Sequence, residues 1–212
     1  MRMRRKKNRD SRFENCIDLV ATEPLENKGK WKEVFGNDNP VHLEIGCGKG
    51  GFILELAKRN PDINYVAMEK CLDALILALE KAKNEALKNV IYICDDAEKL
   101  PEMFEKDEVS RIYLNFSDPW KKARQAKRRL THRRFLEKYK QILVADGEIH
   151  FKTDNRPLFD FSLEEFAETG VHVSELTFDL HNSEYNEGNI MTEYEKTFSQ
   201  KGFTINRCVL KF

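Results

Sequence analysis

The sequence predicts an α/β fold in which helices cover both faces of a mostly parallel sheet. Three observations support this: short β-rich runs alternate with helical segments from residue 41 onward, the connections are short, and the alternation makes five strand–helix steps. With 212 residues, 41% of them hydrophobic, the chain is long enough for one such domain. We interpret residues 1–40 as a basic N-terminal arm with one helix, and residues 41–212 as a single domain.

Each predicted strand leads into a helix. The clearest helix begins at Leu72, where apolar residues recur at i, i+3, i+4 and i+7 with charged residues on the other side. In chain order, strands at 41–45, 63–68, 90–94, 111–116 and 148–152 alternate with helices at 51–59, 72–86, 97–104, 131–143 and 157–168.

The last part of the chain breaks this alternation. Residues 171–180 and 203–211 have the composition of strands, and a helix at 192–200 lies between them. A β-rich end on a parallel sheet suggests antiparallel pairing, so we expect an antiparallel C-terminal edge strand.

The net charge of zero conceals two basic segments. Residues 1–12 carry a net charge of +6, residues 121–134 carry +8 with no acid, and the remaining 186 residues carry −14. Such segregation is typical of a surface that binds a polyanion, such as nucleic acid. For the N-terminal run alone, a solvated tail is an equally good interpretation.

Composition argues against several other classes of protein. The longest wholly apolar run, residues 74–79, is far shorter than the ~18 residues that a membrane span needs. The basic N-terminus has no apolar stretch behind it, so we expect no secretory signal and a cytoplasmic location. The five cysteines and five histidines show no metal-ligand spacing, so we expect no metal.

A glycine loop, residues 46–51, stands between the first predicted strand and its helix. Glycines permit a tight turn there and let a ligand lie against bare backbone at a helix N-terminus. Gly46, Gly48 and Gly51 fit the dinucleotide pattern, whereas Gly46, Gly48 and Gly50 fit the pattern of S-adenosylmethionine enzymes. The glycines alone therefore leave both cofactors open.

Acidic residues at successive strand ends favour S-adenosylmethionine. Glu44 can bind the ammonium group of its methionine part but would repel a pyrophosphate. Glu69 ends the second strand, where an acid binds ribose hydroxyls in either class, and Asp96 ends the third, where it can accept from an adenine amino group. Each carboxylate alone is typical of a solvated strand end, but three beside a glycine loop favour a methyl-donor site.

The fourth strand ends in the sequence of residues 115–120, Asn-Phe-Ser-Asp-Pro-Trp. Asp118 can accept hydrogen bonds from the Watson–Crick edge of a guanine, and Trp120 can stack on a base. An Asp-Pro turn is common by itself, but the basic run that follows would deliver RNA to this point through phosphate contacts. Thr192 and Glu195 fit a capping box, which is sufficient to explain both residues structurally.

Together these motifs resemble the bacterial tRNA (guanine-N7-)-methyltransferases. The resemblance is carried by residues 44–50, 115–120, 127–130, 151–155 and 192–195. It implies a Rossmann-like class I methyltransferase fold with a seven-stranded sheet, and S-adenosylmethionine as the cofactor. It also implies that the partner is tRNA, that the acceptor is N7 of the variable-loop guanine at position 46, and that the protein is a monomer or a homodimer.

By the same resemblance, individual residues take roles. Cofactor binding falls to Glu44, Gly46, Gly48, Glu69, Asp96 and Asp118, with Asp118 also catalytic. Substrate binding falls to Lys122, Asp154, Thr192, Glu193, Tyr194 and Glu195, and RNA binding to Arg124, Gln125, Ala126, Lys127, Arg128 and Arg129. The chain departs from the family's usual residues at Cys47, Glu69, Lys121, Ala123 and Gln125.

The reaction that the resemblance implies requires no general base. Guanine N7 carries an in-plane lone pair, so catalysis can come mainly from positioning, with some electrostatic help. Three alternatives remain open from the sequence. They are methylation of an exocyclic amino group, which the Asp-Pro-Trp motif also suggests, a nicotinamide dehydrogenase, and a non-catalytic RNA-binding protein on the same scaffold.

Overall fold

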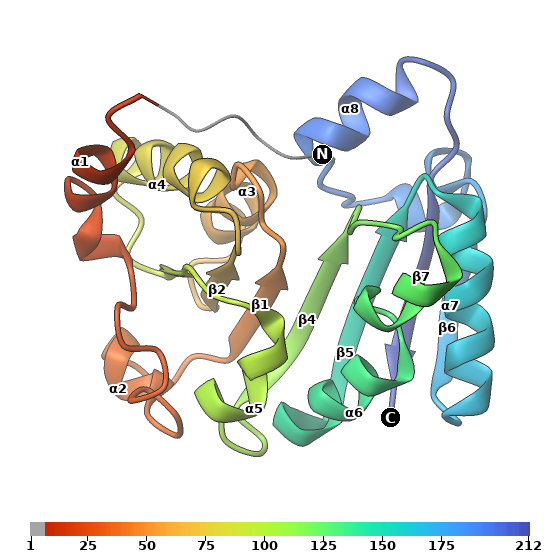
Figure 1. Ribbon diagram of the computed structural model, residues 1–212, viewed down its shortest axis with the longest axis horizontal. Helices are drawn as coiled ribbons and strands as arrows, with labels where there is room; N and C mark the ends of the chain where they lie inside the picture. Colours follow the sequence, from red (N-terminus) through yellow and green to blue (C-terminus); the bar gives the residue numbers. More distant parts are fainter. Residues whose placement is uncertain (1–6) are drawn as a thin grey trace.

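The computed structural model describes residues 7–212, which form a seven-stranded sheet between two layers of helices (Figure 1). The strand order is β3-β2-β1-β4-β5-β7-β6. The strands are β1 (Val41–Ile45), β2 (Asn64–Met68), β3 (Val90–Ile93), β4 (Val109–Asn115), β5 (Leu143–Thr153), β6 (His172–Thr177) and β7 (Asn206–Lys211). The chain order reverses between β1 and β4, and ligands bind α/β sheets at such a switch point.

The first five strands are parallel, and β7 is antiparallel to both β5 and β6. The predicted fold class, with an antiparallel close at the C-terminal edge, is therefore confirmed. The topology adds a detail: β7 lies between β5 and β6, so β6 is the outermost strand.

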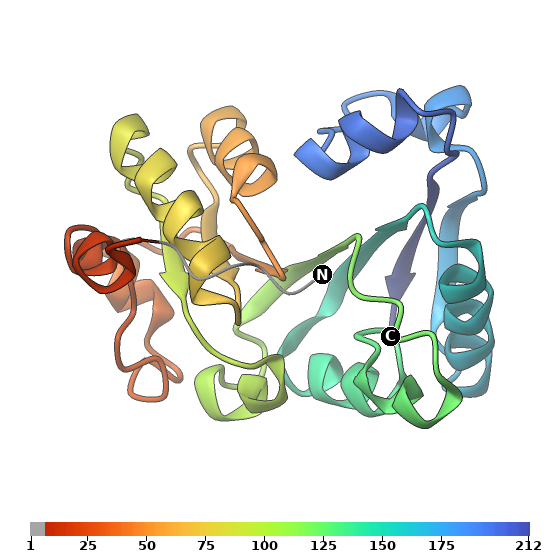
Figure 2. The same cartoon turned by 45° about the horizontal axis from the view of Figure 1, so that its top comes forward.

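Alternating side chains along the strands build two cores, one on each face of the sheet. Leu43 and Ile45 of β1 pack in the core that also holds α5 (Leu100–Met103), α6 (Arg133–Ile142) and α7 (Arg156–Glu168). Tyr65 and Ala67 of β2 face the other way, toward α3 (Gly51–Arg59) and α4 (Leu72–Glu85). Figure 2 shows α3 and α4 on one side of the sheet and α5 and α6 on the other.

The segment before β1 differs from the prediction. The sequence pattern predicts one helix there, whereas the described residues contain α1 (Arg9–Glu14), a 3-10 turn at Ile17–Leu19 and α2 (Trp31–Phe35). The reason is that Pro24 and Gly29 separate two helices too short to show a periodic pattern. Trp31 is fully buried and stacks on Phe104, with 5.1 Å between the two ring centroids.

Part of the predicted basic arm, residues 1–6, lies outside the described residues. Of the remaining bases, Arg12 pairs with Glu80 of α4, with Nε 2.6 Å from Oε1. The division of the chain into an arm and a domain at residue 40 stays a prediction.

The carboxyl ends of the parallel strands meet at one edge of the sheet, and α8 (Glu193–Ser199) lies over that edge (Figure 1). The basic segment forms a 3-10 helix at Ala123–Arg128 near the same edge. Smaller 3-10 turns occur at Ala97–Lys99, Leu180–Asn182 and Glu184–Asn186. Within residues 7–212, no helix is long and apolar enough to cross a membrane.

Candidate active site

The glycine loop is tied to the end of β2. Met68 O accepts from the backbone N–H groups of Gly46 and Cys47 at 2.8 and 3.0 Å. Gly46 has φ +82°, and a Cβ there would meet nothing within 4 Å, so its backbone borders open space. At Gly50, a Cβ would lie only 2.7 Å from Cβ of Ala78. One glycine thus leaves bare backbone toward a ligand, and the other allows α4 to approach closely.

Glu44 is a buried acid on β1 with half of its carboxylate satisfied. Its Oε1 accepts from Nδ2 of Asn115 at 3.1 Å, while Oε2 has no hydrogen-bond partner among the described residues. Burial raises the pKa of Glu44 to about 7, against the opposing effects of Asn115 and of the positive charge on Lys152. A buried oxygen without a partner is costly, so this atom is suited to receive a cationic donor from a ligand.

The acids that end β2 and β3 hold the neighbouring backbone. Glu69 accepts from Gly48 N at 3.0 Å through Oε2 and from Cys71 N at 2.7 Å through Oε1. Asp96 caps a 3-10 turn through Glu98 N at 3.1 Å and also pairs with Lys70. Burial raises the pKa of Asp96, but the hydrogen bonds from Lys70 and from Glu98 N outweigh it and hold the pKa below its usual value.

Two cavities adjoin along the carboxyl edge of the sheet. The first has a volume of about 550 Å³ and is lined by Glu69, Asp96 and Asp118 among others. The second has a volume of about 600 Å³ and is lined by Glu44, the glycine loop and α8. Because Gly46, Asn115 and Phe116 line both, the two cavities meet at the end of β4. The residues predicted from separate strand ends are therefore brought to one continuous site.

The segment that carries Asp118 has an unusual backbone. Phe116 and Trp120 have φ +52° and +41°, a left-handed conformation that non-glycine residues rarely adopt. Arg129 holds this turn, because its Nε donates to Pro119 O at 3.0 Å and its Nη2 to Trp120 O at 3.2 Å. The turn leaves Asp118 exposed in the first cavity.

The predicted RNA-contact residues divide into two groups. Arg124, Lys127 and Arg128 are exposed, and the guanidinium of Arg128 lies 5.0 Å from the Trp120 ring at the first cavity. Gln125, Ala126 and Arg129 are half-buried, and Arg129 is engaged in holding the Asp118 turn. Lys122 is exposed just before the 3-10 helix. Three exposed bases of this segment, of which Arg128 lines the first cavity, are therefore available to a polyanion.

The segment 192–195 begins α8 with the predicted capping box: Glu195 N donates to Thr192 Oγ1 at 2.9 Å, and Thr192 N donates to Glu195 Oε2 at 3.3 Å. Thr192, Glu193 and Tyr194 line the second cavity, whereas Glu195 is fully buried and lines neither cavity. Thr192 and Glu193 therefore border this cavity, and Glu195 does not.

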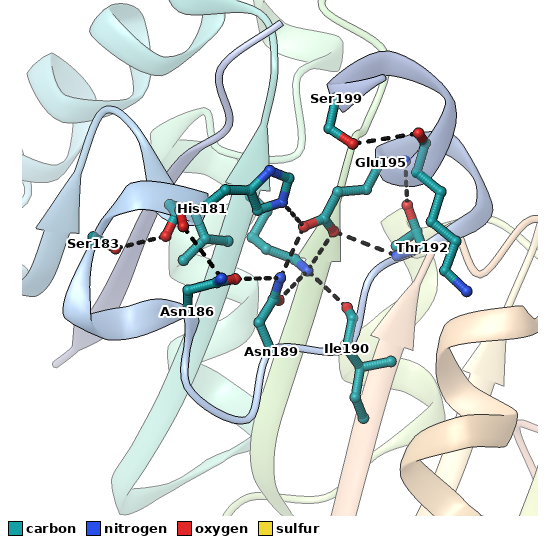
Figure 3. A network of polar contacts seen from close by, with 11 residues as sticks. His181, Ser183, Asn186, Asn189, Ile190, Thr192, Glu195 and Ser199 are labelled. Carbon is teal, nitrogen blue, oxygen red and sulfur yellow. Dashed lines mark hydrogen bonds and ion pairs between the residues drawn. The ribbon is translucent and has the colours of Figure 1, made fainter. Parts of the chain in front are cut away.

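Glu195 is the centre of a buried polar network (Figure 3). Its Oε2 accepts from Nζ of Lys152 at 2.8 Å, and its Oε1 lies 2.9 Å from Nε2 of His181 and accepts from Asn189 at 2.9 Å. Lys152 also donates to Ile190 O at 3.0 Å. The network joins the end of β5 to the start of α8, and it gives Glu195 a positioning role.

Two further contacts fasten α8 over the second cavity. Glu193 pairs with Lys81 of α4, and the hydroxyl of Tyr194 donates to Asp154 at 3.2 Å. Asp154, which follows β5, thus reaches the site through Tyr194.

Three residues that carry no predicted role belong to this site: Asn115, Phe116 and Lys152. Asn115 and Phe116 line both cavities, and Lys152 anchors the network beneath α8. For Asn115 and Lys152 the available signal was a polar residue at or next to the end of a strand, whereas Phe116 offered no such signal.

The comparisons with known proteins agree on one class. The sequence model of a family described as "Putative methyltransferase" matches residues 38–208. A curated relative from Bacillus cytotoxicus, named tRNA (guanine-N(7)-)-methyltransferase, is 51% identical over all of this chain and 97% of its own length. A second relative with that name, from Lachnoclostridium phytofermentans, is 55% identical over 91% of this chain and 90% of its own length.

Solved structures show the same fold. The crystal structure of a SAM dependent methyltransferase from Aquifex aeolicus matches with a TM-score of 0.55 and 15% sequence identity. The match covers 97% of this chain and 98% of that one, and at this identity it speaks for the fold alone.

Proposed function

The chain belongs to the tRNA (guanine-N7-)-methyltransferase family, and from this premise we propose that it methylates N7 of a guanine in the variable loop of tRNA. Its cofactor is S-adenosylmethionine, which supplies an electrophilic methyl group on a sulfonium sulfur. The observation that carries the proposal is the pair of adjoining cavities, with Glu44 in one and Asp118 in the other. Family membership also removes the nicotinamide dehydrogenase as an alternative.

The residues of the site fit the cofactor. Oε2 of Glu44, buried without a partner among the described residues, is suited to the ammonium of the methionine part. Each carboxylate oxygen of Glu69 accepts one hydrogen bond from a backbone N–H group, and the remaining lone pairs can accept from ribose hydroxyls. Asp96 lies beside it in the first cavity, where we assign it to the adenine. Gly46 and Gly48 present backbone without side chains between these two ends.

We assign the acceptor guanine to Asp118. A carboxylate can accept hydrogen bonds from N1–H and from the exocyclic amino group of guanine together. Because both donors lie on the Watson–Crick edge, N7 then faces away from Asp118. N7 needs no deprotonation, so the contribution of the chain is to hold the base in line at the junction of the two cavities. Asp118 is therefore catalytic by direct contact with the base, and its place in the first cavity lets it contact the cofactor as well.

The remaining substrate contacts follow from exposure. Thr192, Glu193 and Tyr194 line the second cavity, and Lys122 is exposed just before the basic 3-10 helix. Asp154 acts through its hydrogen bond with Tyr194, and Glu195 acts through the network that holds α8. Arg124, Lys127 and Arg128 are proposed to contact tRNA phosphates. Since tRNA acts in translation, we place the reaction in the cytoplasm; whether the protein is a monomer or a homodimer stays a prediction.

The experiment that tests this proposal is methyl transfer from labelled S-adenosylmethionine to unmodified tRNA transcripts. Cleavage of the product at N7-methylguanine locates the mark. A mark at N7 of the variable-loop guanine is the expected result. A mark on an exocyclic amino group or in another loop would overturn the assignment of the atom or the loop, and RNA binding without any transfer would favour the non-catalytic alternative.

A further inference from the structure

Four aromatic rings run in sequence from the junction of the two cavities to the surface of α8, and we call them the aromatic row. The ring of Phe116, which lines both cavities, lies 5.1 Å from that of Tyr194. Tyr194 stacks on Phe198 at 4.1 Å with an interplanar angle of 16°, and Phe198 meets Phe203 at 5.5 Å. The row is therefore continuous with the site and leads away from it.

The outer part of the row is exposed. Tyr194 is 42% exposed and Phe203 50%, and both are among the most exposed large apolar side chains of the described residues. A contiguous exposed apolar surface beside an active site marks a place where a partner binds, because scattered single residues would not form a row.

Positive charge accompanies the row. Nζ of Lys201 lies 5.0 Å from the centre of the Phe198 ring. Lys201 is exposed and makes no ion pair with a residue from 7 to 212, so its charge can bind a phosphate. Exposed ring faces with adjacent cations are the features that bind single-stranded nucleic acid, by base stacking and phosphate contact. A cation beside the rings would add nothing to the binding of an apolar protein partner.

We propose that the aromatic row is a stacking platform for unpaired nucleotides next to the target guanine, with Lys201 on a phosphate of that strand. The inference rests on the proposed function and deepens it. A base that enters the cavity leaves its neighbours without a stacking partner, and the row takes the place of that partner. The enzyme then recognises a splayed single strand at this surface rather than the shape of a duplex.

The test uses two variants of Phe203 in the full chain. Phe203→Leu keeps an apolar side chain and removes the ring face, while Phe203→Tyr keeps the ring. We expect Phe203→Leu to raise KM for tRNA by about 10-fold, with kcat and the affinity for S-adenosylmethionine unchanged. Phe203→Tyr should stay close to the wild type.

Phe212→Leu is the matched control. Phe212 is 38% exposed and has Nζ of Lys140 at 5.9 Å from its ring, so it resembles the outer row in exposure and charge. It follows β7 at the opposite edge of the sheet from α8 (Figure 1). KM for tRNA should not change in this variant.

A direct binding measurement separates the row from the proposed function. Fluorescence anisotropy with a labelled, unstructured RNA hexanucleotide, and with the same strand in a duplex, needs no catalysis. We expect the single strand to bind more tightly than the duplex and Phe203→Leu to weaken only the single strand. The stacking proposal would be wrong if Phe212→Leu or Phe203→Tyr weakened binding of the single strand as much as Phe203→Leu does. Preference of the wild type for the duplex would also contradict it. Failure of the wild type to methylate tRNA would instead overturn the proposed function.

Discussion

Asn115 donates to one oxygen of the Glu44 carboxylate at 3.1 Å and leaves the other oxygen buried without a partner among the described residues. The amide fixes the direction of the carboxylate, because Asn115 ends β4 directly beside β1. Glu44 also lines the cavity that the glycine loop borders, so Asn115 sets how its carboxylate is presented at that cavity.

This arrangement makes cofactor affinity depend on pH. Burial raises the pKa of Glu44 to about 7, so the carboxyl is neutral at lower pH and cannot bind an ammonium group. We expect the Kd for S-adenosylmethionine to rise by about 10-fold per pH unit below that pKa and to level off above it. Titration calorimetry between pH 5.5 and 8.5 measures the dependence. In Glu44→Gln the affinity should be lower and flat over this range, and an unchanged pH dependence in that variant would assign it to another group.

Asp118→Asn should impair the positioning of the guanine much more than the binding of the cofactor. The amide presents a donor where guanine also presents donors, so the base loses its orientation. We expect kcat to fall by about 100-fold, while the Kd for S-adenosylmethionine changes much less. Single-turnover methylation and equilibrium cofactor binding measure the two quantities. Unchanged turnover would remove Asp118 from the catalytic role.

The buried pair Lys152–Glu195 should be a large contributor to stability. Lys152 is 5% exposed and Glu195 is fully buried, so Lys152→Met leaves a buried carboxylate without its main partner. We expect this change to lower the free energy of unfolding by about 3 to 5 kcal/mol, as urea denaturation would measure. Lys81→Met removes an exposed pair with Glu193 and should cost about 0 to 1 kcal/mol. The double variant Lys152→Met with Glu195→Gln should recover part of the stability, which a purely steric effect at residue 152 would not allow.

The exposed bases Arg124, Lys127 and Arg128 should set the salt dependence of tRNA binding. Replacing Arg124, Lys127 and Arg128 by Ala should reduce the slope of log affinity against log salt by about 0.7 to 0.9 for each phosphate that is no longer neutralised. Lys32→Ala with Lys106→Ala, beside the start of β1, is the control and should leave the slope unchanged. Equal slopes in all three proteins would make the segment a solvated surface. Arg129→Ala is not part of this test, because Arg129 also holds the turn that carries Asp118 and its loss would disturb that turn.

Gly50→Ala tests the close approach of α4 to the glycine loop. A methyl group there lies 2.7 Å from Cβ of Ala78, at φ +73°. Gly170→Ala is the matched control, since Gly170 has φ +67° and nothing within 4 Å of its Cβ position. Both changes should cost about 1 to 2 kcal/mol for the backbone conformation. Gly50→Ala should cost about 1 to 3 kcal/mol more from overlap and should weaken cofactor binding, and equal Tm values would contradict the clash.

The alternating part of the fold was predictable because its signals are local. Apolar spacing predicts a helix at 72–86, and α4 spans Leu72–Glu85. The helix predicted at 51–59 is found as α3, with Gly50 immediately before it. The acids at the ends of β1, β2 and β3 could be placed together for the same reason, since parallel strands direct all their carboxyl ends to one edge.

The remaining features depend on contacts between residues that are distant in the sequence, and local patterns do not predict such contacts. The Thr192–Glu195 spacing predicts a cap correctly, but Lys152 is distant in sequence, so the burial of Glu195 could not be foreseen. In the sequence Arg129 resembles its basic neighbours, and only the structure shows that it donates to the backbone carbonyls of Pro119 and Trp120. The place of β7 between β5 and β6 is a matter of pairing, which periodicity does not encode.

The position of β7 also bears on how the protein is made. Translation delivers β5 and β6 before β7, and until β7 is inserted both of those strands present open edges to other chains in the cell. The residues assigned to the cofactor, the last of which is Asp118, emerge from the ribosome long before the strand that closes the sheet. Nascent chains would therefore depend on chaperones for this interval, and a stop codon within residues 206–211 would leave a product prone to aggregation.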